Sequence, residues 1–424
     1  MPSLLLTNAR VFDGVHGDCA EGQWVRVADG RIQEIASQPL PTGDARVIDL
    51  AGRTLMPGLI DAHVHAFAAD LDLHRAERLG EAYRTAHAVR MLGHALRCGF
   101  TTVRDVAGAT PGLARALDDG LIAGPRFFHA GRALSMTGGH GDLRLQEEAP
   151  RYQPVCACAG GLLTNSLAVM ADGVDGVLRA AREELRQGAH CIKIMGSGGV
   201  LSPTDPIWMN QYREDEIRAI VGECDARRAY VTAHCHPASA IRRCVDFGVR
   251  TIEHGTLIDA DTARFVAERG AFVVPTMSVI FALCEGGRNM GLSAAVQAKA
   301  DRAFEHAIAG LDIMRRAGVQ LVYGTDLIGS TYTQQCREFT LRARVFTPLE
   351  ILRQATSVNG ELLAISGTRN PYPGAKLGVL EPGAWADLLV VEGNPLEDIR
   401  VLEDPDRNLR VIVKGGQVVK LALD

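Results

Sequence analysis

The middle of this 424-residue chain repeats one pattern, a short apolar run followed by a stretch with helical periodicity. This alternation predicts consecutive strand–helix units whose strands pair into a parallel sheet. Eight candidate strands can be counted: Leu55–His65, Thr101–Asp105, Arg126–Ala130, Cys191–Met195, Tyr230–His234, Thr251–His254, Phe272–Thr276 and Gln320–Asp326. The helical stretches between them include Asp175–Arg186, Glu214–Arg227, Ala238–Asp246 and Ala294–Arg316. Eight units predict an α/β fold of the (β/α)8 TIM-barrel type. A doubly wound sheet is the rival, but no Gly-x-Gly-x-x-Gly motif follows the first strand.

The two ends of the chain have a different pattern, of short strands separated by turn residues. Asp29–Gly30 marks a turn near the N-terminus, and Gly415–Gly416 is a hairpin turn near the C-terminus. Neither end is long enough to bury a core alone. We therefore expect residues 1–57 and 368–424 to combine into one small β-sandwich domain, and residues 58–367 to form the barrel.

Charge and composition exclude several classes of partner. The net charge of −5 gives no basic surface for nucleic acid or for an anionic membrane. No apolar run reaches the roughly 18 residues that span a bilayer, and the first residues lack the basic region of a signal peptide. Ten cysteines are too few for a disulfide scaffold. We expect a cytoplasmic protein with reduced cysteines, which binds neither nucleic acid nor membranes.

Polar residues that can ligate metals or transfer protons stand at or near the ends of most predicted strands. In a TIM barrel the C-terminal ends of the strands meet at one mouth, where active sites are built. We therefore expect these side chains to converge. They are His63 and His65 on the first strand, Lys193 on the fourth, His234 and His236 on the fifth, His254 on the sixth and Asp326 on the eighth.

The first strand ends in a His-x-His motif. Side chains alternate along a strand, so His63 and His65 point to the same side and can hold one ion together. Alone this motif is a weak signal, because two histidines on a strand face can simply hydrogen bond to their neighbours. The later strand-end histidines and Asp326 make a metal site the stronger interpretation.

Lys193 lies between apolar residues, in the run Cys191–Met195. A buried ammonium group is costly, so this side chain needs a partner or a chemical modification. An amine that gains CO2 becomes a carbamate, which is an anionic oxygen ligand able to bridge two cations. The alternative is a barrel lysine that is paired with an aspartate or glutamate.

These residues resemble the amidohydrolase superfamily. The run MPGLIDAHVH from Met56 to His65 is similar to the metal signature of that family, which follows its small β domain. Ala386–Leu388 is similar to the return of the chain to that domain. The resemblance covers nearly the whole chain.

The resemblance implies a centre of two divalent metal ions, for which we expect zinc. The residues matching His63 and His65 bind one ion, a carboxylated Lys193 bridges both, and His234 and His254 bind the second. The residue matching Asp326 contacts the first ion and accepts a proton from the hydroxide that bridges the ions and attacks the substrate. Members are often oligomeric, so we expect a homo-oligomer.

Within the superfamily, the segments Ala133–Arg144 and Gly196–Pro206 resemble the prolidase-like and carboxypeptidase-like branch, to which imidazolonepropionases and ochratoxin amidohydrolases are related. That branch cleaves dipeptides and N-acyl amino acids at the C-terminal residue. The resemblance implies that His140 contacts the substrate carbonyl or the oxyanion formed from it. The alternative is a loop histidine that supports glycine-rich backbone.

The chain departs from the branch at His236, where some prolidase-like members carry a tyrosine. This departure weakens the case for a proline preference. His236 shares a strand face with His234, so we expect it to contact the substrate or to support the ligand. Tyr212, Arg144 and Arg337 are candidates to bind the substrate carboxylate.

Two further segments carry expectations about structure. Residues 145–171 have little regular pattern and are interpreted as a loop or lid over the barrel mouth. Arg104–Asp105 ends the second strand, and we expect it to hold that strand against its neighbours.

The leading hypothesis is a binuclear metal-dependent amidohydrolase that cleaves the C-terminal amide bond of dipeptides or N-acyl amino acids, including aryl amides of the ochratoxin type. A second hypothesis is a cyclic amide hydrolase of the imidazolone or hydantoin type. A third is a non-catalytic scaffold that retains the amidohydrolase fold. Scaffolds of that kind lose metal ligands, whereas this sequence retains each expected ligand.

Overall fold

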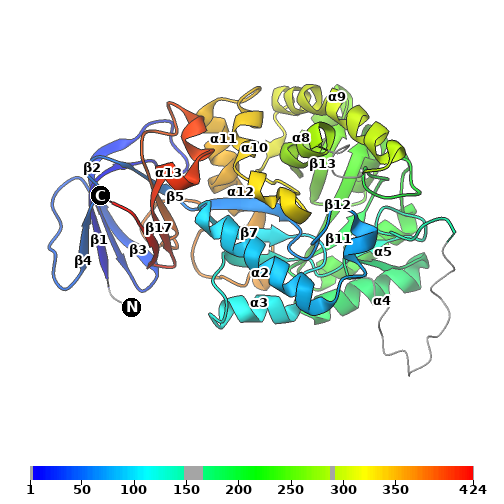
Figure 1. Ribbon diagram of the computed structural model, residues 1–424, viewed down its shortest axis with the longest axis horizontal. Coiled ribbons are helices and arrows are strands. Elements are labelled where there is room, and N and C mark those ends of the chain that lie inside the picture. Colours follow the sequence, from blue (N-terminus) through cyan, green and yellow to red (C-terminus); the bar gives the residue numbers. More distant parts are fainter. Residues whose placement is uncertain (1–2, 148–165, 287–291, 424) are drawn as a thin grey trace.

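The computed structural model describes residues 3–147, 166–286 and 292–423. It consists of a barrel surrounded by helices and a smaller sheet beside it, in which strands from both ends of the chain meet (Figure 1). The lid expected at 145–171 falls mainly on residues 148–165, which lie outside the described residues. Within the described ranges, no helix combines the length and the apolar character needed to cross a bilayer.

The predicted barrel fold is confirmed. Its parallel strands form two hydrogen-bonded arcs, and backbone bonds join the arcs at both seams: Ala62 N to Tyr323 O and His190 N to His129 O, each 2.9 Å. Short strands β9 (Ala133–Ser135) and β10 (Ala168–Met170) extend the second arc beside β11. The barrel strands are β6 (Leu59–Val64), β7 (Phe100–Asp105), β8 (Arg126–His129), β11 (Cys191–Met195), β12 (Tyr230–Pro237), β13 (Thr251–Leu257), β14 (Phe272–Val274) and β15 (Gln320–Leu321).

Helices cover the outside of the barrel. Two of the four helices named from the sequence have the observed bounds, and the other two differ by one or two residues at one end. Local signals explain where helices begin: Ser293 caps the helix that follows it, and Thr347 forms a capping box with Glu350. The helices are α1 (Leu73–Ala76), α2 (Glu81–Arg97), α3 (Pro111–Asp118), α4 (Gly173–Arg186), α5 (Glu214–Ala226), α6 (Ala238–Asp246), α7 (Ala260–Glu268), α8 (Met277–Gly286), α9 (Ala294–Arg316), α10 (Arg337–Arg342), α11 (Pro348–Ala355), α12 (Ser357–Ala364) and α13 (Pro405–Asn408).

The prediction that the two ends of the chain combine into a separate β structure is also confirmed, although their strands form one continuous sheet where a β-sandwich was expected. Its strands are hydrogen bonded into one mixed, eight-stranded sheet around a separate apolar core that includes Leu6, Val25 and Val411. The sheet joins its two halves where β5 pairs with β16 in antiparallel register. Its strands are β1 (Leu4–Val11), β2 (Ala20–Ala28), β3 (Arg31–Ala36), β4 (Arg46–Asp49), β5 (Thr54–Pro57), β16 (Leu388–Val391), β17 (Leu409–Lys414) and β18 (Gln417–Leu421).

One predicted strand, Leu55–His65, is two strands in the structure. The chain leaves the small sheet after β5 and enters the barrel as β6, with Gly58 between them. A Cβ atom at Gly58 would lie 2.1 Å from Thr101 Oγ1, so only glycine allows this close crossing. The Gly58 amide donates to Asp387 O at 2.8 Å, which ties the crossing to the C-terminal part of the chain.

A buried ion pair joins the barrel to the small sheet. Arg126, the first residue of β8, donates from Nε to Asp387 Oδ2 at 2.7 Å and from Nη2 to Oδ1 at 3.3 Å. Its guanidinium group also lies over the ring of Trp385, 4.1 Å from the centroid. Both charges are buried, so each depends on the other.

We predict that Asp387→Asn lowers the free energy of unfolding by about 3 kcal/mol, because it leaves the Arg126 charge buried without its partner. The control is Asp312→Asn, which removes an exposed ion pair to Arg316 on α9 and should cost less than about 1 kcal/mol. Urea denaturation followed by circular dichroism measures both. Equal losses in the two variants would contradict the structural role of the Arg126–Asp387 pair.

Candidate active site

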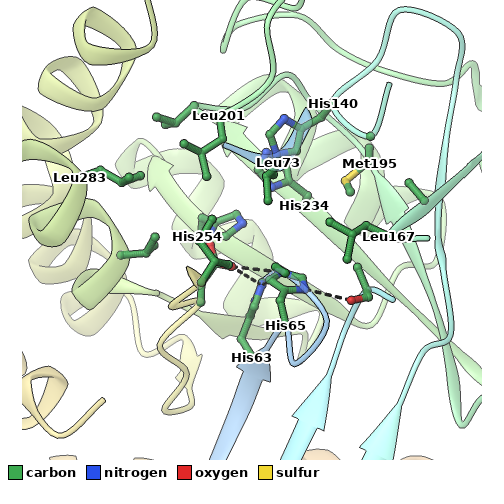
Figure 2. A pocket seen from close by; sticks show the side chains of 18 of the residues that line it. His63, His65, Leu73, His140, Leu167, Met195, Leu201, His234, His254 and Leu283 are labelled. Carbon is green, nitrogen blue, oxygen red and sulfur yellow. Dashed lines mark hydrogen bonds and ion pairs between the residues drawn. The ribbon is translucent and has the colours of Figure 1, made fainter. Parts of the chain in front are cut away.

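A cavity opens at the C-terminal ends of the barrel strands, and the structure brings most of the sequence-predicted site residues together there (Figure 2). They come from several barrel strands and strand-end loops, with His63 and His65 at the end of β6 and His234 and His236 on β12, so the barrel itself determines their spacing. The predicted residues that line the cavity are His63, His65, His140, Lys193, His234, His236, His254 and Asp326.

The first cluster contains His63, His65 and Asp326. His63 Nε2 and His65 Nε2 lie 3.1 Å apart. Asp326 Oδ1 lies 3.2 Å from His63 Nε2 and 3.1 Å from His65 Nε2. His63 Nδ1 lies 2.6 Å from Glu253 Oε2, and His65 Nδ1 lies 3.4 Å from Ala107 O. Because both partners are acceptors, the Nδ1 atoms carry the protons. Two nitrogen lone pairs and a carboxylate therefore face each other, a donor set that fits a cation.

The second cluster contains His234, His236 and His254. Each offers one ring nitrogen as a possible ligand, and these three nitrogens lie within 4.8 Å of one another. His254 also belongs to a group with His63 and Asp326 that meets the same limit, so it connects the two clusters. Its Nδ1 lies 2.7 Å from Thr276 Oγ1, which orients the ring. The sequence placed His236 with the substrate, and in the structure its ring belongs to this cluster.

Two of the clustered side chains are carried by strained backbone. His254 has φ 74° and Asp326 has φ 56°, both in the left-handed region that residues other than glycine rarely adopt. Such conformations cost about 1–3 kcal/mol each and persist where the surrounding structure enforces them. At these positions they aim the His254 and Asp326 side chains into the cavity.

Lys193 is buried at the floor of the cavity. Burial lowers the pKa of its amine, while Glu253 and Asp326 partly oppose that shift. Within the described residues, the structure records no hydrogen bond and no carboxylate within 4.0 Å for this side chain. The alternative of a lysine paired with an aspartate or glutamate is therefore not supported, and an amine modified to a carbamate fits the position.

Burial and neighbouring charges give His234, His236, His254 and Asp326 the protonation states of metal ligands. Burial lowers the pKa of His236 to about 3 and holds the pKa values of His234 and His254 well below 6.5, so these rings are neutral at pH 7. Burial by itself raises the pKa of Asp326, but His63 and His65 hold it well below its usual range. The carboxylate is therefore ionised.

His140 stands beside the second cluster. Its ring stacks on that of His234 with centroids 4.1 Å apart, and its Nδ1 lies 2.8 Å from Ser202 Oγ. The backbone amide of His140 donates to Gln211 Oε1 at 3.0 Å. A Cβ atom at Gly199 would lie 2.2 Å from His140 Cε1, so the neighbouring loop needs glycine to admit the ring.

The candidates for binding a substrate carboxylate lie elsewhere, and none lines the cavity as described. Arg144 donates to both oxygens of Asp142, at 2.7 and 2.5 Å. Arg337 pairs with Glu285, at 2.7 Å for the closest atoms. The Tyr212 hydroxyl is buried without a hydrogen bond, so the predicted substrate-binding roles of Tyr212 and Arg144 gain no support from the geometry.

The sequence did not identify Glu253 as part of the site. Its carboxylate binds His63 and also accepts from Arg104 Nη2 at 2.7 Å, and Arg104 Nε donates to Ala62 O at 2.7 Å. Arg104 thus holds the second barrel strand against its neighbours, as expected. The one available signal for Glu253 was its position directly before His254 at a strand end.

We predict that Thr276→Val weakens the binding of a divalent cation, tested with Zn²⁺, about 10-fold, because the variant loses the hydroxyl that orients the ring of His254, a candidate metal ligand. The control is Thr102→Val, since the buried Thr102 hydroxyl has no hydrogen-bond partner. Competition against a chromophoric chelator measures the affinity of both. Unchanged affinity in Thr276→Val would show that this hydroxyl does not support a metal ligand.

Comparison with known proteins places the chain in a family. The model of the Amidohydrolase family matches residues 54–419. Ochratoxinase from Aspergillus niger is 35% identical over 379 residues, which are 86% of this chain and 75% of that protein. A crystal structure of an amidohydrolase is 43% identical, covers 100% of both chains and has a TM-score of 0.93. A prolidase crystallised with N-methylphosphonate-L-proline is 41% identical over 99% of this chain and 100% of its own, with a TM-score of 0.92. The chain belongs to the amidohydrolase family of hydrolases.

Proposed function

We propose that the protein is a binuclear metal-dependent hydrolase of the C-terminal amide bond of dipeptides or N-acyl amino acids, including aryl amides of the ochratoxin type. The observation that carries this proposal is the pair of histidine clusters joined by His254, with Asp326 and an unpaired Lys193 beside them. The similarity to a prolidase and to ochratoxinase supports amide chemistry. A non-catalytic scaffold is disfavoured because every expected ligand position holds a ligating residue.

We assign the ligands as follows. His63, His65 and Asp326 would hold one ion, His234 and His254 would hold the other, and a carboxylated Lys193 would supply an anionic oxygen ligand. Zinc is the proposed metal, because imidazole and oxygen ligands at buried sites suit it. Two bound divalent cations would lower the pKa of a shared water and polarise the scissile carbonyl.

Asp326 is the proposed proton carrier. Its Oδ1 faces the Nε2 atoms of His63 and His65, and its Oδ2, which lies 3.8 Å from His254 Nδ1, is the oxygen proposed to face the reacting groups. The ionised carboxylate accepts a proton from the attacking water and delivers it to the amide nitrogen as the carbon–nitrogen bond breaks. The products are a carboxylate and a free amine.

His140 is the proposed donor to the substrate carbonyl. Its Nδ1 lies 2.8 Å from Ser202 Oγ, and in the proposed tautomer this hydroxyl donates to Nδ1 and the ring carries its proton on Nε2. That N–H can donate to the carbonyl oxygen, whose negative charge grows as the water attacks. His236 lies next to the same region and is proposed to contact the substrate.

We predict that chelator-treated protein regains activity when Zn²⁺ and bicarbonate are supplied together, and that it then releases free amino acids from a library of dipeptides and N-acyl amino acids. Asp326→Asn should lower kcat at least about 1000-fold, because the proton carrier is lost. Asp312→Asn, which changes a half-buried aspartate on α9, should retain full activity. A library without turnover at full metal occupancy would overturn the reaction class and favour the cyclic amide hydrolase.

We predict that His140→Gln lowers kcat about 100-fold and changes KM little, because the proposed hydrogen bond strengthens mainly in the transition state. Steady-state kinetics on the best library substrate measures both constants. Metal content, determined by mass spectrometry, should equal that of the unmodified protein. A large rise in KM with unchanged kcat would show instead that His140 contributes to ground-state binding.

A further inference from the structure

The cavity above the clustered histidines has two apolar walls. The first, here called the α8 wall, consists of Val279, Ile280 and Leu283 on α8 with Ala300 and Ala303 on α9. The second, here called the β11 wall, consists of Ala107, Leu167, Ala168 and Met195. All of these side chains line the same cavity as His63 and Asp326.

The two walls lie on opposite sides of the barrel. Helix α8 follows β14, the seventh barrel strand, whereas Ala107 follows the second strand and Met195 ends the fourth. In an eight-stranded barrel the seventh strand stands across from the third. Figure 2 agrees, because Leu283 lies on one side of the histidines and Leu167 and Met195 lie on the other.

An amide substrate has two substituents that extend away from its planar peptide group in opposite directions. If its carbonyl lies beside His140 and the clustered histidines, one substituent reaches toward the α8 wall and the other toward the β11 wall. In an N-acyl amino acid these substituents are the acyl chain and the amino-acid side chain. Each half of the substrate therefore meets an apolar surface.

Neither wall offers a partner for a charge. Among the described residues that line the cavity, the acidic and basic groups are Asp326, Lys193 and the histidines. Asp326 faces His63 and His65, and Lys193 is buried at the floor. A charged acyl chain or a charged amino-acid side chain placed against either wall would lose its hydration without gaining a partner, which is costly. The α-carboxylate is common to every N-acyl amino acid and is attached beside the scissile nitrogen, so the two walls bear on the acyl chain and the side chain alone.

We infer that the substrates of this site carry an uncharged apolar group on each side of the scissile amide, with the α8 wall selecting one group and the β11 wall the other. This inference rests on the proposed function and narrows it. It replaces the broad class of dipeptides and N-acyl amino acids by amides that join a hydrophobic acyl group to a hydrophobic amino acid.

The test is a grid of N-acyl amino acids assayed with the zinc-loaded protein. The acyl groups are acetyl, succinyl, hexanoyl and benzoyl, and the amino acids are glycine, aspartate, lysine, leucine and phenylalanine. Hexanoyl or benzoyl compounds of leucine or phenylalanine should exceed the succinyl, aspartate and lysine compounds at least about 10-fold in kcat/KM. Equal kcat/KM for charged and apolar groups would overturn the inference.

Two variants assign the walls. Leu283→Ala should change the relative kcat/KM values about 10-fold either among the acyl groups or among the amino acids. Met195→Ala should change them about 10-fold in the other of these two series. The matched controls are Leu311→Ala on α9 and Met91→Ala on α2, which are buried but outside the cavity lining and should leave the order of substrates unchanged. A change along the same axis in both wall variants would contradict opposite walls.

A binding measurement separates this inference from the proposed function. Calorimetry on the unmodified zinc-loaded protein, with ketomethylene analogues in which CH2 replaces the scissile NH, gives the Kd for each pair of groups without turnover. If the protein binds apolar compounds selectively but hydrolyses none of the grid compounds, the proposed reaction is refuted and the selection by the two walls is supported. Hydrolysis with no preference for apolar groups would refute the selection by the two walls and support the proposed reaction. No binding of any compound would refute both proposals.

Discussion

The carboxylate of Glu253 lies in the middle of the barrel, where water cannot solvate it, and the polar floor of the cavity depends on its contacts. Arg104 and Thr232 hold one of its oxygens, and the other faces His63 Nδ1. Burial raises the pKa of Glu253, but Arg104 and His63 hold it well below its usual value, so the group stays ionised. An ionised Glu253 fixes the tautomer of His63 and leaves its Nε2 lone pair directed at the cavity.

The same hydrogen-bond network makes the geometry of the site depend on the register of the barrel strands. Arg104 bonds to β6 through Ala62 O, to β12 through the Tyr230 hydroxyl and to β13 through Glu253. One guanidinium group therefore connects strands that carry ligands of both clusters. The arrangement is costly to desolvate, and it is satisfied only when all of these strands are in register.

Much of the barrel fold and of the candidate site could be predicted from the sequence, because the patterns that indicate them are local. The alternation that puts His63 and His65 on one strand face holds for any strand, and the end of each apolar run marks the barrel mouth. The break at Gly58 could not be predicted, because it depends on Thr101 in another strand. Likewise, the contact between His63 and Glu253 joins residues 190 positions apart, and the apolar walls depend on how helices pack after the barrel closes. The zinc ions, the carboxylated lysine, the cytoplasmic location and the homo-oligomer stay predictions.

The shared sheet has a consequence for the order in which the protein can be completed during synthesis. Strand β5 finds its main partner in β16, and the entire barrel separates the two in the chain. Until β16 leaves the ribosome, the pairing edge of β5 has no partner of its own and is open to other strands. The barrel strands are therefore all synthesised before the small sheet can be completed. Strands β16, β17 and β18, made after the barrel, complete the sheet that β1 to β5 began.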